Sequence, residues 1–231
     1  MSAVSKISLR TNDSAKDEMS VVMAELDGQA NSDHSPSQPL EQFKGKYGRY
    51  LDVDDDGIPY RTIPGTHATH GAFVTRGSSR DEYAVYTEDG AAYRRNVDRL
   101  AKKWDTAKEL VPQPEIRVSS PHVSKGSTDG VIYFGTSTYA AEEALEFLEA
   151  DGIHLDAMRA RGFPFGQAFR DFVDAHERIF VIEQNRDAQF RSLMMIELGT
   201  NAAKLISVLN YDGMPITADN IFRQIKAAIT K

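Results

Sequence analysis

Residues 129–231 alternate between short apolar runs and amphipathic stretches, a pattern typical of strands that are each followed by a helix. The apolar runs predict strands at 131–134, 153–159, 179–182 and 205–209. A strand covered on both faces is a continuous apolar run, because its two sides are both buried. Four strand–helix alternations imply parallel pairing with helical crossovers. The sequence therefore predicts an α/β fold, a three-layer domain with a mostly parallel sheet.

Polar residues between these runs predict where the helices begin and end. Ser137 or Thr138 is expected to cap the first helix and Thr217 the last, because a side-chain oxygen can accept an N–H of the first turn. Asn185 is expected to do the same after the third strand. Gly152 is predicted to end the first helix in the left-handed conformation.

Residues 89–111 place apolar side chains at intervals of four and three residues, which predicts one long helix with a continuous apolar seam. Proline follows at 112 and 114 and stops the helix. We favour packing of this seam on its own domain over an intermolecular coiled coil, which the same spacing permits. The seam residues are Tyr93, Val97, Leu100, Trp104, Ala107 and Val111.

The chain before this helix has little apolar periodicity. Residues 1–45 are rich in Asn, Ser, Asp, Gln and Pro and are predicted to be poorly ordered alone, although 18–26 could form a short helix. Residues 46–79 are dense in Gly, Pro, Tyr and Arg. Irregular segments of this length are usually functional or wrapped on a partner.

Three aspartates in this loop match the first half of a calcium-binding pattern. They are Asp52, Asp54 and Asp56, followed by Gly57. The second half fails, because Ile63 stands where a bidentate Glu is required. An acidic turn is therefore favoured over a calcium site.

Composition narrows the class of protein. The 231 residues include no cysteine, which excludes disulfides, thiolate zinc sites, a cysteine nucleophile and iron–sulfur clusters held by this chain. The net charge of -7 argues against a nucleic-acid partner. No apolar run approaches the roughly 18 residues that span a bilayer, and the first residues lack the apolar core of a signal peptide. We expect a cytoplasmic protein without a membrane partner.

Few residue patterns suggest chemistry. The turn 135–138 lies between a strand and a helix, where backbone N–H groups can hold an anion. It lacks the P-loop and dinucleotide patterns, so an ordinary capped turn is favoured. His67 and His70 share one loop and could bind a metal or a carboxylate, but surface histidines are the commoner case. His176 continues an apolar helix face and is expected to be a packing residue.

A polar cluster follows the third predicted strand: Glu183, Asn185, Arg186, Asp187 and Arg191. Carboxyl ends of parallel strands are where open α/β sheets place ligands or partner subunits. These residues could act on a ligand, but we favour an interface or a structural role at the sheet edge. The residues alone provide no self-sufficient catalytic set, and no catalytic residue is predicted.

Two stretches of the chain resemble a known family. They are GRYLDVDDDGIPYRTIPGTHATHGAFVTRGSSRDEYAVYTEDGAAYRRNVDRLAKKWDTAK and FVIEQNRDAQFRSLMMIEL. Both resemble the α subunit of 2-oxoacid:ferredoxin oxidoreductases, with the 2-oxoglutarate synthase (2-oxoglutarate:ferredoxin oxidoreductase) branch as the best match. The similarity runs from about Lys46 to Ile229.

The resemblance implies a thiamine-diphosphate enzyme. It would decarboxylate a 2-oxoacid oxidatively, pass electrons through an iron–sulfur cluster to ferredoxin, and deliver the acyl group to coenzyme A. In that family the β subunit holds thiamine diphosphate and Mg²⁺. No cofactor is expected on this chain alone.

The resemblance also implies a division of the chain. Residues 46–111 would be the end of a pyrimidine-binding domain, formed by a loop-rich segment and the long helix. Residues 112–128 would be a linker and 129–231 a transketolase C-terminal-like domain, with 1–45 as a poorly ordered segment. A full α subunit starts with a γ-like domain and the body of the pyrimidine domain, which 1–45 do not resemble. We therefore expect a C-terminal portion, from a split subunit, a decayed gene or a misplaced start.

The resemblance suggests which residues reach substrate or cofactor: Tyr60, Arg61, Thr66, His67 and Arg76. Either arginine could pair with a carboxylate bidentately, and either could equally fix the loop against the β subunit. The family motif carries Pro and Lys after its Gly-Thr-His, whereas this sequence has Ala68 and His70. The role of the loop therefore does not transfer directly.

The function expected from the resemblance is a part of the α subunit that forms the subunit interface and one wall of the active site, inactive alone. The expected partners are the thiamine-diphosphate-binding β subunit, ferredoxin, coenzyme A and the 2-oxoacid. One alternative is a catalytically inactive structural or regulatory α/β interaction protein derived from that subunit. Another is a small-molecule-binding module that uses the 135–138 turn.

Overall fold

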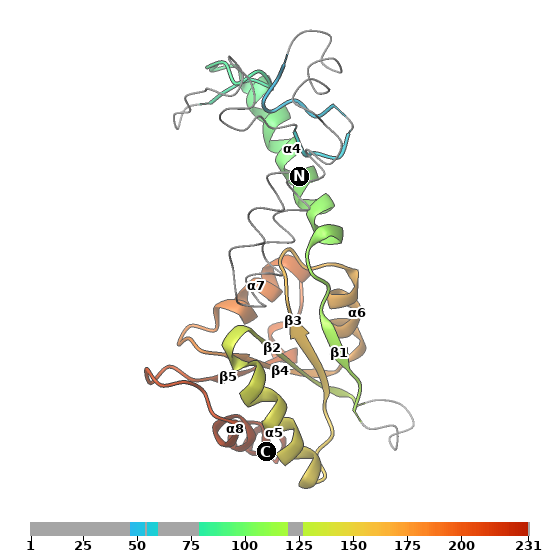
Figure 1. Ribbon diagram of the computed structural model, residues 1–231, viewed down its shortest axis with the longest axis vertical. Coiled ribbons are helices and arrows are strands. Elements are labelled where there is room, and N and C mark those ends of the chain that lie inside the picture. Colours follow the sequence, from blue (N-terminus) through green and yellow to red (C-terminus); the bar gives the residue numbers. More distant parts are fainter. Residues whose placement is uncertain (1–46, 54, 60–78, 120–126, 231) are drawn as a thin grey trace, which may run out of the picture. The chain divides into compact units, whose positions relative to one another are not determined.

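The computed structural model describes residues 47–53, 55–59, 79–119 and 127–230 (Figure 1). The chain divides after Val111 into two compact units, 1–111 and 112–231. Within the described ranges, no helix is long and apolar enough to cross a membrane. The finer boundaries at residues 45 and 128 remain predictions.

The C-terminal unit is built on a five-stranded sheet with the strand order β1-β3-β2-β4-β5. Strands β2 to β5 are parallel, and β1 pairs with β3 in the antiparallel direction at one edge. This confirms the predicted α/β fold with a mostly parallel sheet. The strands are β1 (Glu115–Arg117), β2 (Asp129–Phe134), β3 (Asp156–Ala160), β4 (Arg178–Glu183) and β5 (Leu205–Leu209).

Two strands differ from the prediction. Strand β1 lies within the predicted linker 112–128, and its three exposed residues give no apolar run from which to predict it. Strand β3 begins at Asp156 rather than at residue 153. The preceding helix ends with Gly152 at φ +78°, and the N–H of Ile153 donates to the carbonyl of Leu148 (2.8 Å). Ile153 therefore belongs to the C-terminal capping motif of α5, and strand β3 begins three residues after it.

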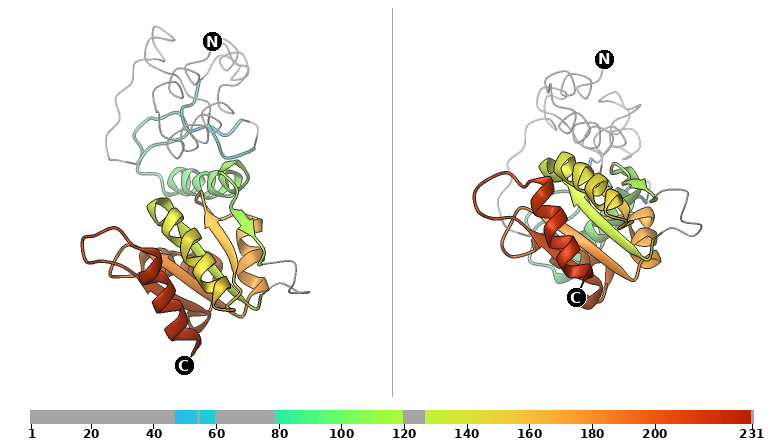
Figure 2. Two further views of the ribbon diagram at one scale, coloured as in Figure 1. Left: turned by 60° about the horizontal axis from the view of Figure 1, so that its bottom comes forward. Right: turned by 90° about the horizontal axis from the view of Figure 1, so that it is seen from below.

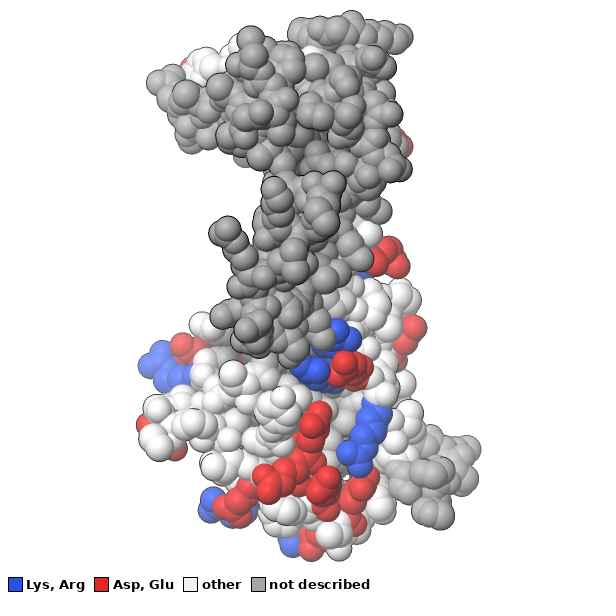
Figure 3. Space-filling view, in the orientation of Figure 1, with Lys and Arg blue, Asp and Glu red and all other residues white. Residues whose placement is uncertain are grey.

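Helices cover both faces of the sheet and form the predicted three layers (Figure 2). On one face lie α5 (Thr138–Ala150) and α8 (Ala218–Ile229); on the other lie α6 (Gln167–Ala175) and α7 (Gln189–Leu198). The outer side of α5 carries exposed glutamates, and Figure 3 shows Asp and Glu side chains gathered on one face of this unit.

Strand β4 lies inside the sheet and contributes to both cores. Phe180 and Ile182 pack with α5 and α8, whereas Ile179 and Val181 pack with α6 and α7. All four are at most 1% exposed. Successive side chains of a strand point to opposite faces, so a continuous apolar run is what this position requires.

The helix starts were predicted with mixed success. Thr217 caps α8 as expected, with its hydroxyl accepting the N–H of Asn220 (3.2 Å). The prediction for Ser137 or Thr138 was wrong. Ser137 donates its hydroxyl to the carbonyl of Phe134 (2.6 Å) and Thr138 to that of Gly135 (2.7 Å). A hydroxyl turned back toward a carbonyl does not accept a helical N–H.

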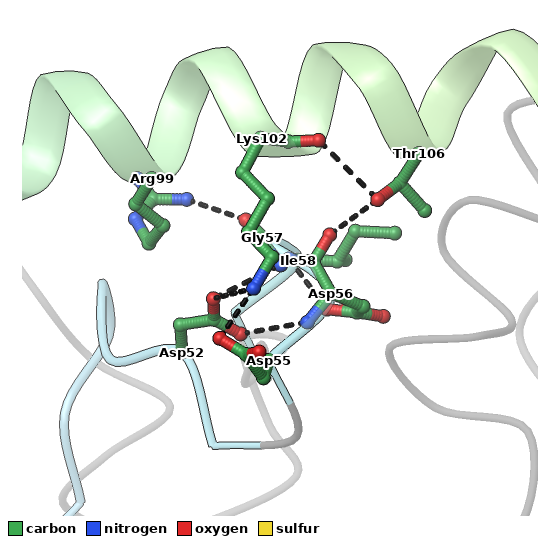
Figure 4. Close-up of polar contacts among 8 residues, drawn as sticks. All are labelled: Asp52, Asp55, Asp56, Gly57, Ile58, Arg99, Lys102 and Thr106. Carbon is green, nitrogen blue, oxygen red and sulfur yellow. Dashed lines mark hydrogen bonds and ion pairs between the residues drawn. The ribbon is translucent and has the colours of Figure 1, made fainter.

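In the N-terminal unit, an acidic loop packs against helix α4 (Gly90–Leu110) (Figure 4). The carbonyl of Gly57 accepts from the Arg99 guanidinium (3.0 Å), and the carbonyl of Asp56 accepts from the Thr106 hydroxyl. Lys102 forms ion pairs with Asp52 and Asp55. Three successive turns of the helix therefore hold this loop.

The apolar seam of α4 is largely exposed. Tyr93, Val97, Leu100 and Trp104 are 57%, 43%, 53% and 44% exposed, whereas Ala107 and Val111 are buried. The loop contacts a different side of the helix, through Arg99, Lys102 and Thr106. The favoured interpretation, a seam packed on its own domain, is wrong for Tyr93, Val97 and Leu100. Polar contacts to the loop decided which side of α4 is covered, and the apolar spacing does not encode those contacts.

Candidate functional site

The carboxyl edge of the sheet contains a topological switch point. Strand β2 lies between β3 and β4, and the chain leaves β2 toward α5 on one face and leaves β4 toward α7 on the other. At such a point the two departing loops separate and leave a crevice between them. Open α/β sheets place their ligands there.

A groove of about 570 Å³ lies at this edge. It is formed by the residues that follow β2, β4 and β5, and its rim includes Tyr211 and Met214, which are 64% and 69% exposed. The described residues that line it are Thr136, Gln184, Asn210, Tyr211, Gly213, Met214 and Pro215.

The polar groups of the groove wall are bonded mainly to each other. The amide of Gln184 donates to the Thr136 hydroxyl (2.8 Å) across the crevice and accepts the N–H of Ile216 (3.2 Å). The amide nitrogen of Asn210 donates to the carbonyl of Met214 (2.8 Å) and to Asp212 (3.2 Å). The seven lining residues include no carboxylate, imidazole, ammonium or guanidinium group. The groove can therefore hold an apolar surface or a ring, but it lacks an acid–base pair.

The turn 135–138 forms one wall of the groove. It folds as a short 3₁₀ helix, Gly135–Ser137, with Gly135 at φ +56°. Of its side chains, the Thr136 hydroxyl faces Gln184 while those of Ser137 and Thr138 bond to carbonyls. This supports the ordinary-turn interpretation over a phosphate cradle.

Glu183, at the end of β4, is fully buried and organises the start of α7. Its carboxylate accepts the N–H groups of Phe190 (2.7 Å) and Arg191 (2.9 Å) and the side-chain amide of Asn185 (2.8 Å). The N–H of Gln189 is accepted by the Asn185 oxygen (3.1 Å), as predicted. The first three N–H groups of the helix are thus satisfied, and the carboxylate lies at the positive end of the helix dipole.

The other predicted members of this cluster divide into two groups. Arg191 donates to the carbonyls of Leu205 and Ala202 (2.8 Å each) and so ties α7 to the start of β5. Arg186 and Asp187 form an exposed ion pair (2.7 Å). The structure therefore gives Glu183, Asn185 and Arg191 structural bonds at the sheet edge. Contact with a partner through Arg186 and Asp187 stays a prediction.

The loop residues expected to reach substrate or cofactor lie outside the described residues: Tyr60, Arg61, Thr66, His67 and Arg76. His70 lies outside them as well. Their predicted roles stay predictions.

The acidic turn uses its carboxylates on its own backbone. Asp52 accepts the N–H groups of Asp56 and Gly57 (3.1 Å each), and Asp56 accepts that of Ile58 (2.7 Å). This agrees with the acidic-turn interpretation. Among the described residues, no three His, Asp or Glu side chains are arranged to hold a metal ion.

His176 is a satisfied packing residue, as expected. It is 5% exposed, and its Nδ1 lies 2.7 Å from the carbonyl of Phe172. Its Nε2 lies 3.2 Å from the carboxylate of Asp156, which also accepts the N–H of Ser119 (2.7 Å). Burial raises the pKa of Asp156, but the hydrogen bonds from Ser119 and His176 outweigh burial and leave this pKa below its usual range.

We expect Asp156→Asn to lower the free energy of unfolding at pH 7 by about 1–2 kcal/mol, because an amide is a poorer acceptor for these donors. The folded carboxylate has a lowered pKa, so its stabilisation is complete above the unfolded value of about 3.9 and is lost as the pH falls through the folded value. Urea unfolding of both proteins between neutral and acid pH measures the difference. The difference in free energy of unfolding between the two proteins should become smaller only at acid pH. A difference that does not change with pH would contradict the lowered pKa of Asp156.

Sequence reasoning missed most of the groove. Asn210 and Tyr211 directly follow the predicted strand 205–209, so the rule that ligands bind beyond the carboxyl ends of parallel strands points to them. The bond between Gln184 and Thr136 could not be found this way. It joins residues 48 positions apart that only the strand order makes neighbours.

Comparison with known proteins supplies the family context. No family model matches the chain. A 2-oxoacid:ferredoxin oxidoreductase subunit alpha of Saccharolobus solfataricus is 28% identical over 186 residues, which cover 78% of this chain and 28% of the relative. The chain resembles part of such an α subunit.

The fold of this portion is similar to a solved oxidoreductase structure. That structure is a 2-oxoglutarate:ferredoxin oxidoreductase from Magnetococcus marinus, with 2-oxoglutarate, coenzyme A and succinyl-CoA bound. The match has a TM-score of 0.66 at 21% identity and covers 80% of this chain and 31% of the solved one. At 21% identity, this match shows a similar fold and nothing more. The chain spans less than a third of the length of either protein.

Proposed function

We propose that this chain is a portion of the α subunit of a thiamine-diphosphate-dependent 2-oxoacid:ferredoxin oxidoreductase, with 2-oxoglutarate as the oxoacid. The complete enzyme would decarboxylate the oxoacid oxidatively and form an acyl-CoA. The chain would contribute part of the subunit interface and one wall of the active site. The observation that carries this proposal is the 28% identity to a subunit alpha over 78% of the chain.

The geometry of the C-terminal unit supports a role in assembly rather than in bond breaking. Its carboxyl edge has a groove with a neutral wall and an apolar rim, next to the exposed pair Arg186–Asp187. Glu183 and Arg191 hold the start of α7 in place from within. An edge that combines exposed apolar side chains with a neighbouring ion pair is suited to contact with another subunit.

The described residues do not fit the cofactors of such an enzyme. The groove wall offers no cation for a diphosphate, and no described group of carboxylates and histidines is arranged for Mg²⁺. We therefore assign no step through thiamine diphosphate or an iron–sulfur cluster to this part of the chain. Thiamine diphosphate and the iron–sulfur cluster would be bound by other parts of the complex. The loop arginines Arg61 and Arg76 would pair with the substrate carboxylate at the edge of the active site.

Affinity purification of the chain tagged at Lys231 from its source cells tests this proposal. We expect it to be recovered with a thiamine-diphosphate-binding subunit, and the recovered complex to reduce ferredoxin in the presence of 2-oxoglutarate and coenzyme A. Arg186→Glu should lower the recovery of the partner, because it replaces the cation with a second negative charge beside Asp187 at the proposed interface. Arg223→Glu on α8 is the matched control, since Arg223 is similarly exposed and pairs with Asp219.

Two results would overturn the proposal. Recovery of the chain alone at its own mass would favour the inactive structural or regulatory protein. Recovery with a partner that binds no thiamine diphosphate would favour the same alternative and identify what it regulates.

A further inference from the structure

Strand β5 forms one edge of the five-stranded sheet (Figure 1). Its inner neighbour is β4, and no described strand lies on its outer side. The strand, LISVL, is uncharged and contains two β-branched residues. An edge strand of this kind presents a row of N–H and C=O groups on which a strand of another molecule can pair. Natural proteins cover or block such edges.

The backbone groups of β5 divide into two sets. The N–H of Asn210 donates to the carbonyl of Glu183 on β4 (3.0 Å), which shows which residues face that strand. Successive residues of a strand direct their N–H and C=O groups to opposite sides in the plane of the sheet. The even-numbered residues from 206 to 210 therefore face β4. The residues whose backbone groups face outward are Leu205, Ser207 and Leu209.

Gln224 of α8 takes the place of a neighbouring strand beside Leu209. Its side-chain oxygen accepts the N–H of Leu209 (3.2 Å), and its side-chain nitrogen donates to the carbonyl of the same residue (3.1 Å). A residue of a paired antiparallel strand would make the same two bonds. The side-chain nitrogen of Gln224 also donates to Asn220, one turn earlier on α8, and this bond fixes the orientation of the amide.

Leu205, the first outward residue, is closed by other contacts. Its N–H donates to the carbonyl of Ala202, and its carbonyl accepts from the Arg191 guanidinium (2.8 Å). Within the described residues, the outward N–H and C=O groups of Ser207 are then the only ones of β5 that have no hydrogen-bond partner. One open residue between two closed ones is too short a stretch for another strand to pair with.

We propose that Gln224 closes the β5 edge by standing in for a strand, and that it thereby keeps the β5 strands of two copies of this chain from pairing. Without its amide, Ser207 and Leu209 are both open. Two such edges can pair in the antiparallel direction about a twofold axis, with Ser207 of each copy opposite Leu209 of the other. Each of these residue pairs exchanges two N–H···O bonds. This contact goes beyond the proposed oxidoreductase function and does not require it.

Sedimentation of the full chain at increasing concentration, together with amide hydrogen exchange resolved at Ser207, tests the proposal. We expect Gln224→Ala to associate at concentrations at which the wild type does not, because two successive outward residues are open. In the associated form the N–H of Ser207 gains an acceptor. Its exchange in Gln224→Ala should therefore become at least about tenfold slower as the concentration rises, whereas in the wild type it should not depend on concentration.

Two further variants separate an open edge from a loss of stability. Gln224→Glu keeps an acceptor for the N–H of Leu209 and places a charge at the edge, so it should lose the bond to the carbonyl but should not associate. Gln167→Ala is the matched control, because Gln167 is an exposed glutamine of α6 whose amide donates to Asp171 (2.7 Å). It should sediment like the wild type. Circular dichroism checks that all three variants keep their helix content.

Three results would overturn the proposal. If Gln224→Ala sediments like the wild type at every concentration, the edge is closed without this amide. Association of Gln224→Ala without slower exchange at Ser207 would place the contact on another surface. Equal association of Gln224→Glu and Gln224→Ala would make lost stability, and not the open edge, the cause.

Discussion

Glu183→Ala is expected to lower the free energy of unfolding of the C-terminal unit by about 2–4 kcal/mol. The substitution removes the acceptor for the N–H groups of Phe190 and Arg191 and for the amide of Asn185, within a fully buried site. Buried donors left without an acceptor lose the full free energy of their hydration. Urea unfolding followed by circular dichroism at 222 nm in both proteins measures the loss.

A second variant separates the lost acceptor from the lost volume. Glu183→Gln fills the same space but presents an amide to three donors. It should therefore restore less than half of the free energy of unfolding that Glu183→Ala loses. Glu177→Gln is the matched control, because Glu177 is exposed near the other end of the same strand, and it should change stability by less than about 0.5 kcal/mol. A wild-type-like Glu183→Gln would mean that volume, and not hydrogen bonding, explains the burial of this side chain.

Gly57→Ala is expected to release the acidic loop from α4, at a cost of about 2–4 kcal/mol in the stability of that contact. Gly57 has φ +82°, which disfavours any residue with a Cβ. A Cβ there would also lie 2.8 Å from the Cα of Lys103 and still closer to its nitrogen. Both obstacles are backbone atoms, so no change of rotamer can relieve the overlap. Amide hydrogen exchange should accelerate at Asp56, Gly57 and Ile58, whose N–H groups bond to the loop carboxylates.

Gly90→Ala is the control for this substitution. Gly90 opens α4, and an added Cβ there meets no atom within 4 Å. It should be neutral or slightly stabilising, because alanine loses less conformational freedom on folding. Unchanged exchange in the loop of Gly57→Ala would show that the loop does not depend on this close approach.

The resemblance found in the sequence and the comparison with known proteins lead to the same family by different routes. The resemblance rested on the strings EQNRDAQ and IPYRTIPGTH. The structure shows what the residues of EQNRDAQ do. Within EQNRDAQ, Glu183 and Asn185 hold the first turn of α7, while Arg186 and Asp187 remain at the surface. Residues 60–67 of the second string lie outside the described residues, so its predicted contact with substrate stays a prediction.

The sequence by itself determined the α/β class, the four parallel strands, the long helix and the left-handed end at Gly152. These depend on local periodicity and on the conformational freedom of single residues, which a sequence encodes directly. Only the tertiary structure decided the rest. The edge strand β1 has no apolar pattern, the groove joins loops far apart in the chain, and the side of α4 that is covered follows from polar contacts with the acidic loop. These features arise from pairing between distant residues, whose energy no local pattern records.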